Sequence, residues 1–206
     1  IETNLVVIGS GPAGYAAAFR AQDLGVQTVL IEKHAQLGGV CLNVGCIPSK
    51  AYLSVAEKIH DAKSLGAYGA DIDVSHMSSE DLHNMKNNIV SKLSGGLEML
   101  AKKRRVQTVT GEAVFVDSHT LSVRTDSGEQ TIKFKHAIIA TGSEPNRLPF
   151  LPEDERIFDS TGALELKDIT GHMVVIGGGI IGCEMATIYQ LFGAQVTVLE
   201  VLPNIM

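Results

Sequence analysis

An internal repeat constrains the fold of this 206-residue chain more than any other feature. Leu5–Gly9 reads Leu-Val-Val-Ile-Gly, and Met173–Gly177 reads Met-Val-Val-Ile-Gly, 168 positions later. The same offset relates Glu32 to Glu200. Each copy reads as an apolar run, a glycine turn, a helix, a second apolar run and an acid. Short, continuous apolar runs are typical of parallel strands covered on both faces, so the chain is predicted to hold two α/β units of one kind.

The first glycine turn, Gly9-Ser10-Gly11-Pro12-Ala13-Gly14, follows a strand, opens a helix and is followed by Glu32. This arrangement is typical of dinucleotide binding. Gly9 allows a tight turn, Gly11 lets a pyrophosphate approach the backbone, and Gly14 lets helix and strand pack. The helix N-terminus carries about half a positive charge for the phosphates, and Glu32 can accept hydrogen bonds from ribose hydroxyls.

The second turn, Gly177-Gly178-Gly179-Ile180-Ile181-Gly182, leads to Glu200 in the matching position. A carboxylate there suits a free 2′-hydroxyl and repels a 2′-phosphate, so Glu200 favours NAD over NADP, although a solvated strand end remains the alternative. Two such turns in one chain indicate electron transfer between two dinucleotides, a flavin and a nicotinamide being the natural pair.

Cys41 and Cys46 lie five positions apart, just before a predicted helix in which Pro48 suits the first turn. An ideal helix would not bring them together, so a bridge between them needs an irregular turn. A small ring of this kind should be easily reduced, and the helix start and Lys50 would favour the thiolate. Metal binding, which usually needs more closely spaced ligands, and two unrelated buried thiols are the alternatives; Cys183 is read as a small buried thiol.

Further elements are expected between the two copies. Helices are predicted from about 47 to 64 and from 79 to 103, with Ser79 as the cap of the second. Short β-type runs with turns between them predict a meander over 106–110, 113–116, 120–124, 130–134 and 137–140. Three prolines then mark a crossing segment, so the predicted domains are 1–145, which holds the first glycine turn and the cysteine pair, and 146–206, the incomplete start of a second dinucleotide-binding domain. Spacing alone does not tell which of the two turns binds the flavin.

Composition excludes several classes of function. The net charge of −6 argues against nucleic acid as the main partner. No stretch reaches the roughly 18 apolar residues that a bilayer span needs, and the first residues lack a signal peptide's features. Three cysteines are too few for a disulfide scaffold, so a reducing compartment is expected.

The segment from Gly38 to Lys50, GGVCLNVGCIPSK, resembles the redox-active disulfide motif of the pyridine nucleotide–disulfide oxidoreductases, class I. Within that family it is most similar to the dihydrolipoamide dehydrogenases. The resemblance implies an α/β fold: an FAD-binding Rossmann-like domain with an antiparallel meander, followed by a second, NAD-binding one. It implies a disulfide between Cys41 and Cys46, with Cys46 nearest the flavin and Cys41 exchanging with substrate. Lys50 would lie near the flavin, paired with Glu184.

The resemblance also implies the two cofactor sites. The FAD contacts would be Gly9, Gly11, Pro12, Ala13, Gly14, Glu32, Lys33, Gly39, Val40, Cys41, Cys46, Lys50, Ala113, Thr141 and Gly142. The NAD contacts would be Gly177, Gly179, Ile180, Ile181, Gly182 and Glu200. No metal is expected. Lys50 and Glu184 could instead be ordinary charges on helix surfaces.

The function that the resemblance implies is oxidation of protein-bound dihydrolipoamide through Cys41–Cys46 and FAD, with reduction of NAD. The partners would be the lipoyl domains of 2-oxoacid dehydrogenase or glycine cleavage complexes, and a second copy in a homodimer. The location would be a bacterial cytoplasm or a mitochondrial matrix. The family's acid–base histidine lies in a C-terminal domain with no counterpart here, so we expect this chain to be part of a longer protein. The alternatives are a glutathione-type or mercuric reductase, or an inactive fragment that keeps only the binding fold.

Overall fold

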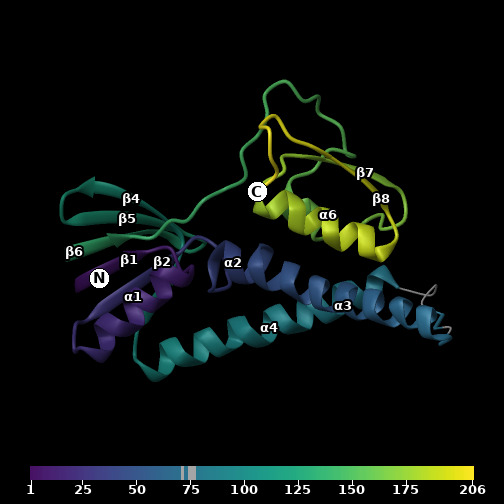
Figure 1. Cartoon of the computed structure of the whole chain (residues 1–206). Coiled ribbons are helices and arrows are strands. Elements are labelled where there is room, and N and C mark those ends of the chain that lie inside the picture. Colours follow the sequence, from purple (N-terminus) through teal and green to yellow (C-terminus); the bar gives the residue numbers. More distant parts are fainter. Residues whose placement is uncertain (71, 74–77) are drawn as a thin grey trace. The chain divides into compact units, whose positions relative to one another are not determined.

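The computed structural model describes residues 1–70, 72–73 and 78–206 (Figure 1). The chain divides into two compact units: the first comprises Ile1–Asn43 and Val90–Glu144, and the second Val44–Ile89 and Pro145–Met206. Residues 44–89 thus join the second compact unit, although the predicted FAD domain runs from 1 to 145. That predicted boundary concerns cofactor-binding domains and stays a prediction.

The first unit is built on a six-stranded sheet of order β3-β2-β1-β6-β5-β4. The strands are β1 (Glu2–Ile8), β2 (Thr28–Glu32), β3 (Gln107–Thr110), β4 (Glu112–Asp117), β5 (Thr120–Thr125) and β6 (Gly128–Ile139). The pairs from β3 to β6 are parallel, and the pairs among β6, β5 and β4 are antiparallel. Only Gly111 separates β3 from β4, yet these strands end the sheet order on opposite sides, so the sheet must curl back on itself.

One strand differs from its prediction. The runs 130–134 and 137–140 were predicted as two strands, but both lie in the single 12-residue strand β6. Its first half pairs with β5, and its second half continues along β1 from Lys133 to Ile139. A strand that changes partner midway carries two hydrophobic patterns, and local sequence therefore predicts two strands where the structure has one. The meander is therefore made of β4, β5 and β6, while β3 pairs with β2.

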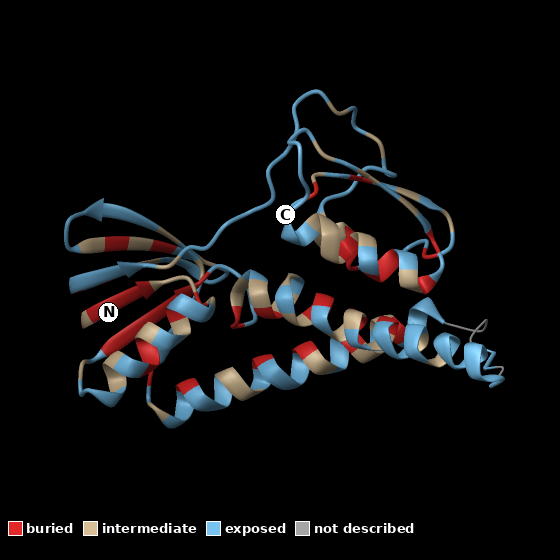
Figure 2. Ribbon diagram, in the orientation of Figure 1, coloured by how far each residue is buried: buried red, intermediate tan, exposed pale blue. Residues whose placement is uncertain are grey.

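Alternation along the central strands divides the core between the two faces of the sheet. Leu5, Val7 and Leu30 pack with Phe19 on one face, and Val6, Val29 and Ile31 pack with the meander residues on the other. Successive strand residues point to opposite faces, so a strand that is buried on both faces is apolar at most positions. Figure 2 shows β2 in the buried colour along its length, and all five of its residues are buried.

Two helices border this sheet in the chain. Helix α1 (Pro12–Asp23) follows β1, and helix α4 (Ser79–Lys103) precedes β3. Pro12 suits the first turn, where no intrahelical donor is lost. The cap of α4 is Ser78 and not Ser79 as predicted, because the Ser78 hydroxyl accepts from the Asp81 N–H at 3.1 Å. The two adjacent serines could not be told apart by residue type.

The second unit contains a two-stranded parallel sheet, β7 (His172–Ile176) and β8 (Gln195–Leu199), joined through α6 (Ile180–Phe192). Helix α3 (Cys46–Ser64), the 3₁₀ turn η1 (Leu65–Tyr68) and the short α5 (Ser160–Ala163) complete it; α2 (Gly39–Val44) crosses the division between the units. Its core includes Tyr52, Leu166, Ile188 and Tyr189, each at most 2% exposed.

Two tyrosine hydroxyls tie the helices of the second unit to the end of α5. Tyr52 of α3 donates to the Leu164 carbonyl at 3.1 Å, and Tyr189 of α6 donates to the Ala163 carbonyl at 2.7 Å. Burial raises the pKa of Tyr189 to about 12 and that of Tyr52 still further. Both hydroxyls therefore remain donors throughout the physiological range.

Candidate active site

The first glycine turn has the tight geometry that the motif predicts. The Gly9 N–H donates to the Ile31 carbonyl at 2.8 Å, and Gly9 adopts φ +97°. A Cβ on Gly9 would lie 2.2 Å from the Ala140 oxygen, and one on Gly14 would lie 1.8 Å from the Gly9 oxygen. These two glycines are required by protein packing alone.

Gly11 is different. It is the N-cap of α1 with φ −64°, which any residue can adopt, and a Cβ there would meet no atom closer than the Gly39 Cα at 4.0 Å. Conversely, a Cβ on Gly39 would lie 2.6 Å from the Gly11 Cα, at φ +61°. The space beside Gly11 is open at the N-terminus of α1, and a helix N-terminus suits an anionic pyrophosphate.

Glu32 ends β2 beside this turn and is buried. Its Oε2 accepts from the Ser10 N–H at 2.9 Å and the Ser10 hydroxyl at 2.6 Å, and its Oε1 accepts from the His34 N–H at 3.0 Å. Burial alone would raise the pKa of Glu32, but these hydrogen bonds outweigh it and hold the pKa below its ordinary value. Glu32 therefore stays a carboxylate that also braces the turn.

The remaining predicted FAD contacts within the first unit fall into three groups. Thr141 and Gly142 follow β6 directly, and the Thr141 Cα would lie 3.2 Å from a Cβ on Gly9, so this turn adjoins the glycine turn. Ala113 is half-buried in β4, against the meander core. The others, Pro12, Ala13, Lys33 and Val40, are exposed.

The second glycine turn repeats the main backbone contacts of the first. The Gly177 N–H donates to the Leu199 carbonyl at 2.8 Å, and a Cβ on Gly182 would lie 2.0 Å from the Gly177 oxygen. A Cβ on Gly179 would meet no atom of the described residues within 4 Å, so the space there is open, as it is at Gly11. Ile180 and Ile181 are exposed at the start of α6.

Glu200 occupies the position of Glu32 in this second turn. Its Oε1 accepts from the Leu202 N–H at 2.8 Å and its Oε2 from the Gly178 N–H at 2.6 Å. These two hydrogen bonds lower the pKa of Glu200. Gly178 corresponds to Ser10, so the second residue of each turn donates its N–H to the acid that follows the next strand.

The two cysteines lie in different helices. Cys41 is in α2 and half-buried, whereas Cys46 is the first residue of α3 and exposed; Gly45 between them has a non-helical backbone that breaks the helix. The break at Gly45 agrees with the predicted irregular turn, and the pairing itself stays a proposal.

Lys50 and Glu184 form the ion pair that the resemblance implies, although they lie 134 positions apart. The Lys50 ammonium contacts Oε1 of Glu184, and the Ser49 hydroxyl donates to Oε2 at 3.0 Å. The Lys50 side chain is 61% exposed, whereas that of Glu184 is 15% exposed. Helices α3 and α6 therefore join one carboxylate to two consecutive residues of the cysteine segment.

The sequence did not predict the contacts of three site residues. Ser10 binds Glu32 twice, Ser49 binds Glu184, and Asn43 has a buried Oδ1 with no partner among the described protein atoms while its amide donates to Leu37 and Gly39 carbonyls. All three lie inside motifs in which the glycines, the cysteines and the lysine were the residues that predicted a function. A polar residue expected to be buried within such a motif was the available signal.

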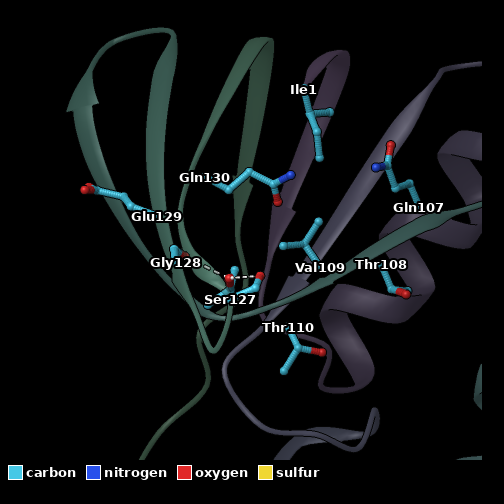
Figure 3. Close-up of a pocket in the computed structure, with 10 residues that line it drawn as sticks. Ile1, Gln107, Thr108, Val109, Thr110, Ser127, Gly128, Glu129 and Gln130 are labelled. Carbon is cyan, nitrogen blue, oxygen red and sulfur yellow. Dashed lines mark hydrogen bonds between the residues drawn. The ribbon is translucent and has the colours of Figure 1, made fainter.

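Two of the cavities lined by described residues lie in the first unit. One, of about 500 Å³, is lined by β3 and the β5–β6 hairpin and contains none of the predicted site residues (Figure 3). The other, of about 380 Å³, lies between α4 and β3 and includes Glu32. Neither cavity includes the glycines of the turns. Within the described ranges no group of three or more His, Cys, Asp or Glu is arranged for a metal ion, and no helix there is long and apolar enough to cross a membrane.

The fold and the turns define an α/β protein of the Rossmann-like type with a curled sheet. The family model described as pyridine nucleotide-disulphide oxidoreductase matches residues 3–206. The chain belongs to this family, and the predicted fold class is confirmed.

Individual proteins similar to this chain are disulfide oxidoreductases of the same kind. The chain is 50% identical over 208 residues to the dihydrolipoyl dehydrogenase of Haemophilus influenzae, covering 100% of this chain and 44% of that protein. It is 46% identical over 207 residues to that of Vibrio cholerae, with the same coverages. Among solved structures, the HOCl-induced flavoprotein disulfide reductase RclA from Escherichia coli matches with a TM-score of 0.81 at 31% identity, covering 98% of this chain and 43% of that one. The chain thus spans less than half the length of the relatives it matches.

Proposed function

We propose that this chain is the FAD-binding part, with the start of the NAD-binding part, of a flavoprotein disulfide oxidoreductase that oxidises protein-bound dihydrolipoamide and reduces NAD. The observation that carries the proposal is the segment from Cys41 to Lys50. It bears two thiols, leads into α3, and ends in a lysine that pairs with Glu184 of the second repeat. The identity to dihydrolipoyl dehydrogenases over the whole chain supports it.

The residues present fit a bound FAD. The open space at Gly11, the close approach of Gly39 and the N-terminus of α1 suit the pyrophosphate. Glu32 receives three hydrogen bonds from protein, and a carboxylate has about four lone-pair sites, so one site remains for a ribose hydroxyl. FAD, when bound, would supply the acceptor for the two electrons of the reduced cysteine pair.

The thiol chemistry belongs to the chain's own residues. In the oxidised protein, a thiolate of dihydrolipoamide would attack the Cys41 sulfur and release Cys46 as a thiolate. The second substrate thiolate would then break the mixed disulfide, release Cys41 and leave lipoamide oxidised. Cys46 begins a 19-residue helix, where the helix dipole is positive, and Lys50 follows one turn later, so negative charge on the leaving sulfur is stabilised.

For the second cofactor we propose NAD at the Gly177–Gly182 turn. Gly179 leaves open space at the start of α6, and Glu200 is held as a carboxylate beside the turn. A carboxylate in that position favours a ribose with a free 2′-hydroxyl. The full protein would act as a homodimer on the lipoyl domains of 2-oxoacid dehydrogenase or glycine cleavage complexes. The two relatives named above are bacterial, which favours a bacterial cytoplasm.

A visible spectrum of the full-length protein tests this proposal directly. We expect bound flavin, and a long-wavelength band when a dithiol reduces the protein anaerobically. The Cys46→Ser variant should keep the flavin but lose both the band and lipoamide turnover. A Cys46→Ser protein that reduced NAD with dihydrolipoamide at the normal rate would exclude the mechanism.

The coenzyme separates the main proposal from a glutathione-type or mercuric reductase. We expect NADH to reduce the flavin of the full-length protein much faster than NADPH does. A strong preference for NADPH would instead favour the rival reductases.

A further inference from the structure

Glu184 is held by two consecutive residues of α3 that contact different oxygens. The Lys50 ammonium contacts Oε1, and the Ser49 hydroxyl lies 3.0 Å from Oε2. Ser49 is 3% exposed, whereas the Lys50 side chain is 61% exposed. The buried partner of this carboxylate is therefore the serine and not the lysine.

The single proton of the Ser49 hydroxyl has two acceptors within reach. Besides Glu184, the Cys46 carbonyl lies 3.2 Å from Oγ. That carbonyl belongs to the first turn of α3, where it is the acceptor for the backbone N–H four residues on. A carboxylate is also the stronger acceptor because it is charged. The hydroxyl proton is therefore directed to Glu184.

An exposed lysine is a weak anchor by itself. Ion pairs with an exposed partner contribute little, because solvent screens them and the long side chain loses entropy. A buried, short side chain with one rotatable hydroxyl holds the carboxylate with less loss of freedom. The direction in which Glu184 presents Oε1 is then set by Ser49, and the position of the Lys50 ammonium follows from it.

We propose that Ser49 is a positioning residue of the disulfide–flavin site, which acts by orienting Glu184 and, through it, Lys50. This rests on the function proposed above. The competing explanation is that Ser49 is an ordinary buried helical serine. Ser94 of α4 is such a serine: it is also 3% exposed and donates to the carbonyl three residues back, at 3.3 Å, but it contacts no carboxylate among the described residues. Ser94 is therefore the matched control.

The experiment compares S49A, S49T, S94A, E184Q and S49A/E184Q in the full-length flavoprotein. The readouts are flavin content, KM for dihydrolipoamide, and the anaerobic rate of flavin reduction by dihydrolipoamide. Loss of a hydrogen bond to a charged group predicts about a tenfold slower flavin reduction in S49A. Flavin content and KM should stay unchanged. S49T should restore the rate, and S94A should match the unchanged protein.

The double variant separates positioning from general packing. If Ser49 acts through Glu184, S49A should slow the E184Q protein by less than about twofold. An undiminished tenfold loss in the E184Q background overturns the proposal. If the added methyl group of S49T prevents folding, the proposal is tested by comparing the effect of S49A in the unchanged protein with its effect in the E184Q protein.

A second readout does not depend on turnover. In the flavin-free protein, the rate at which an acylating reagent modifies Lys50, followed by mass spectrometry, should rise about two- to fivefold in S49A as the ion pair loosens, and not in S94A. Equal rates in S49A and the unchanged protein overturn the proposal. If the unchanged protein binds no flavin or ignores dithiols, the proposed function fails instead, and the acylation result still stands by itself.

Discussion

The glycines of the first turn should separate cleanly into those that the fold requires and one that only a ligand requires. In the Gly14→Ala variant the new Cβ lies 1.8 Å from the Gly9 oxygen. The obstacle is backbone at the end of β1, so it cannot move aside as a side chain would. Overpacking a core typically costs 1–3 kcal/mol, and we expect a destabilisation of about 3 kcal/mol or more here.

In the Gly11→Ala variant the new Cβ has no neighbour closer than 4.0 Å, and the backbone needs no special φ. The loss of a good N-cap residue costs at most about 1 kcal/mol. The apoprotein should therefore stay nearly as stable as the unchanged one. The same methyl group would occupy the space proposed for the pyrophosphate, so flavin affinity should fall at least about 100-fold, equivalent to about 2.7 kcal/mol.

The assay is denaturant unfolding of the flavin-free full-length protein together with titration of FAD by fluorescence. Gly11→Ala should lose affinity and keep stability, whereas Gly14→Ala should lose both. If the two apoproteins were equally destabilised, the fold itself would require Gly11, and the argument that a ligand requires it would be wrong. Normal FAD affinity in Gly11→Ala would place the pyrophosphate elsewhere.

Three further predictions concern buried polar contacts. Glu32→Gln should destabilise the protein by about 2 kcal/mol above roughly pH 5, because the charge-assisted hydrogen bonds to the carboxylate are lost. Since the folded state lowers the pKa of Glu32, this stabilising contribution should shrink as the pH falls below the ordinary value of 4.5. Denaturant unfolding of both proteins as a function of pH measures the difference. The Lys86 side chain is 8% exposed and its ammonium lies 3.3 Å from the carboxylate of Glu165, which is 47% exposed. Glu165→Ala leaves a buried ammonium and should lower the free energy of unfolding in urea by about 3 kcal/mol, whereas Lys86→Met should lower it much less. Equal losses in the two variants would contradict this. Tyr52→Phe should cost about 1 kcal/mol through the lost bond to the Leu164 carbonyl without changing flavin content, and a large loss of flavin would contradict it.

Much of the local structure could be read from the sequence because short-range rules govern it. The helix 79–103 was predicted with the bounds that α4 has, and the prediction of a helix from about 47 to 64 differs by one residue from α3. The repeat predicted that the two turns would share one geometry, and the matching bonds of Gly9 and Gly177 bear this out. Where local signals competed, prediction failed: two adjacent serines at the start of α4, and two β runs within β6.

The candidate site shows the same division. Glycine spacing and the acid after the second strand identified Glu32 and Glu200 beside their turns, since a strand–turn–helix unit brings together residues about 23 positions apart. The pairing of Lys50 with Glu184 came from resemblance alone, because no local rule relates residues 134 positions apart. The partners of Ser49 and Asn43 could not be predicted, because burial decides what a serine or asparagine binds, and burial is a property of the packed helices.

By itself, then, the sequence determined the repeat, the class of fold, the glycine turns and the cysteine segment, since each depends on residue type and short spacing. Only the tertiary structure decided that Gly11 faces open space while Gly14 is packed, and that a buried serine shares the carboxylate of Glu184 with an exposed lysine. The physical reason is that close approach and hydrogen-bond satisfaction depend on atoms brought from distant parts of the chain.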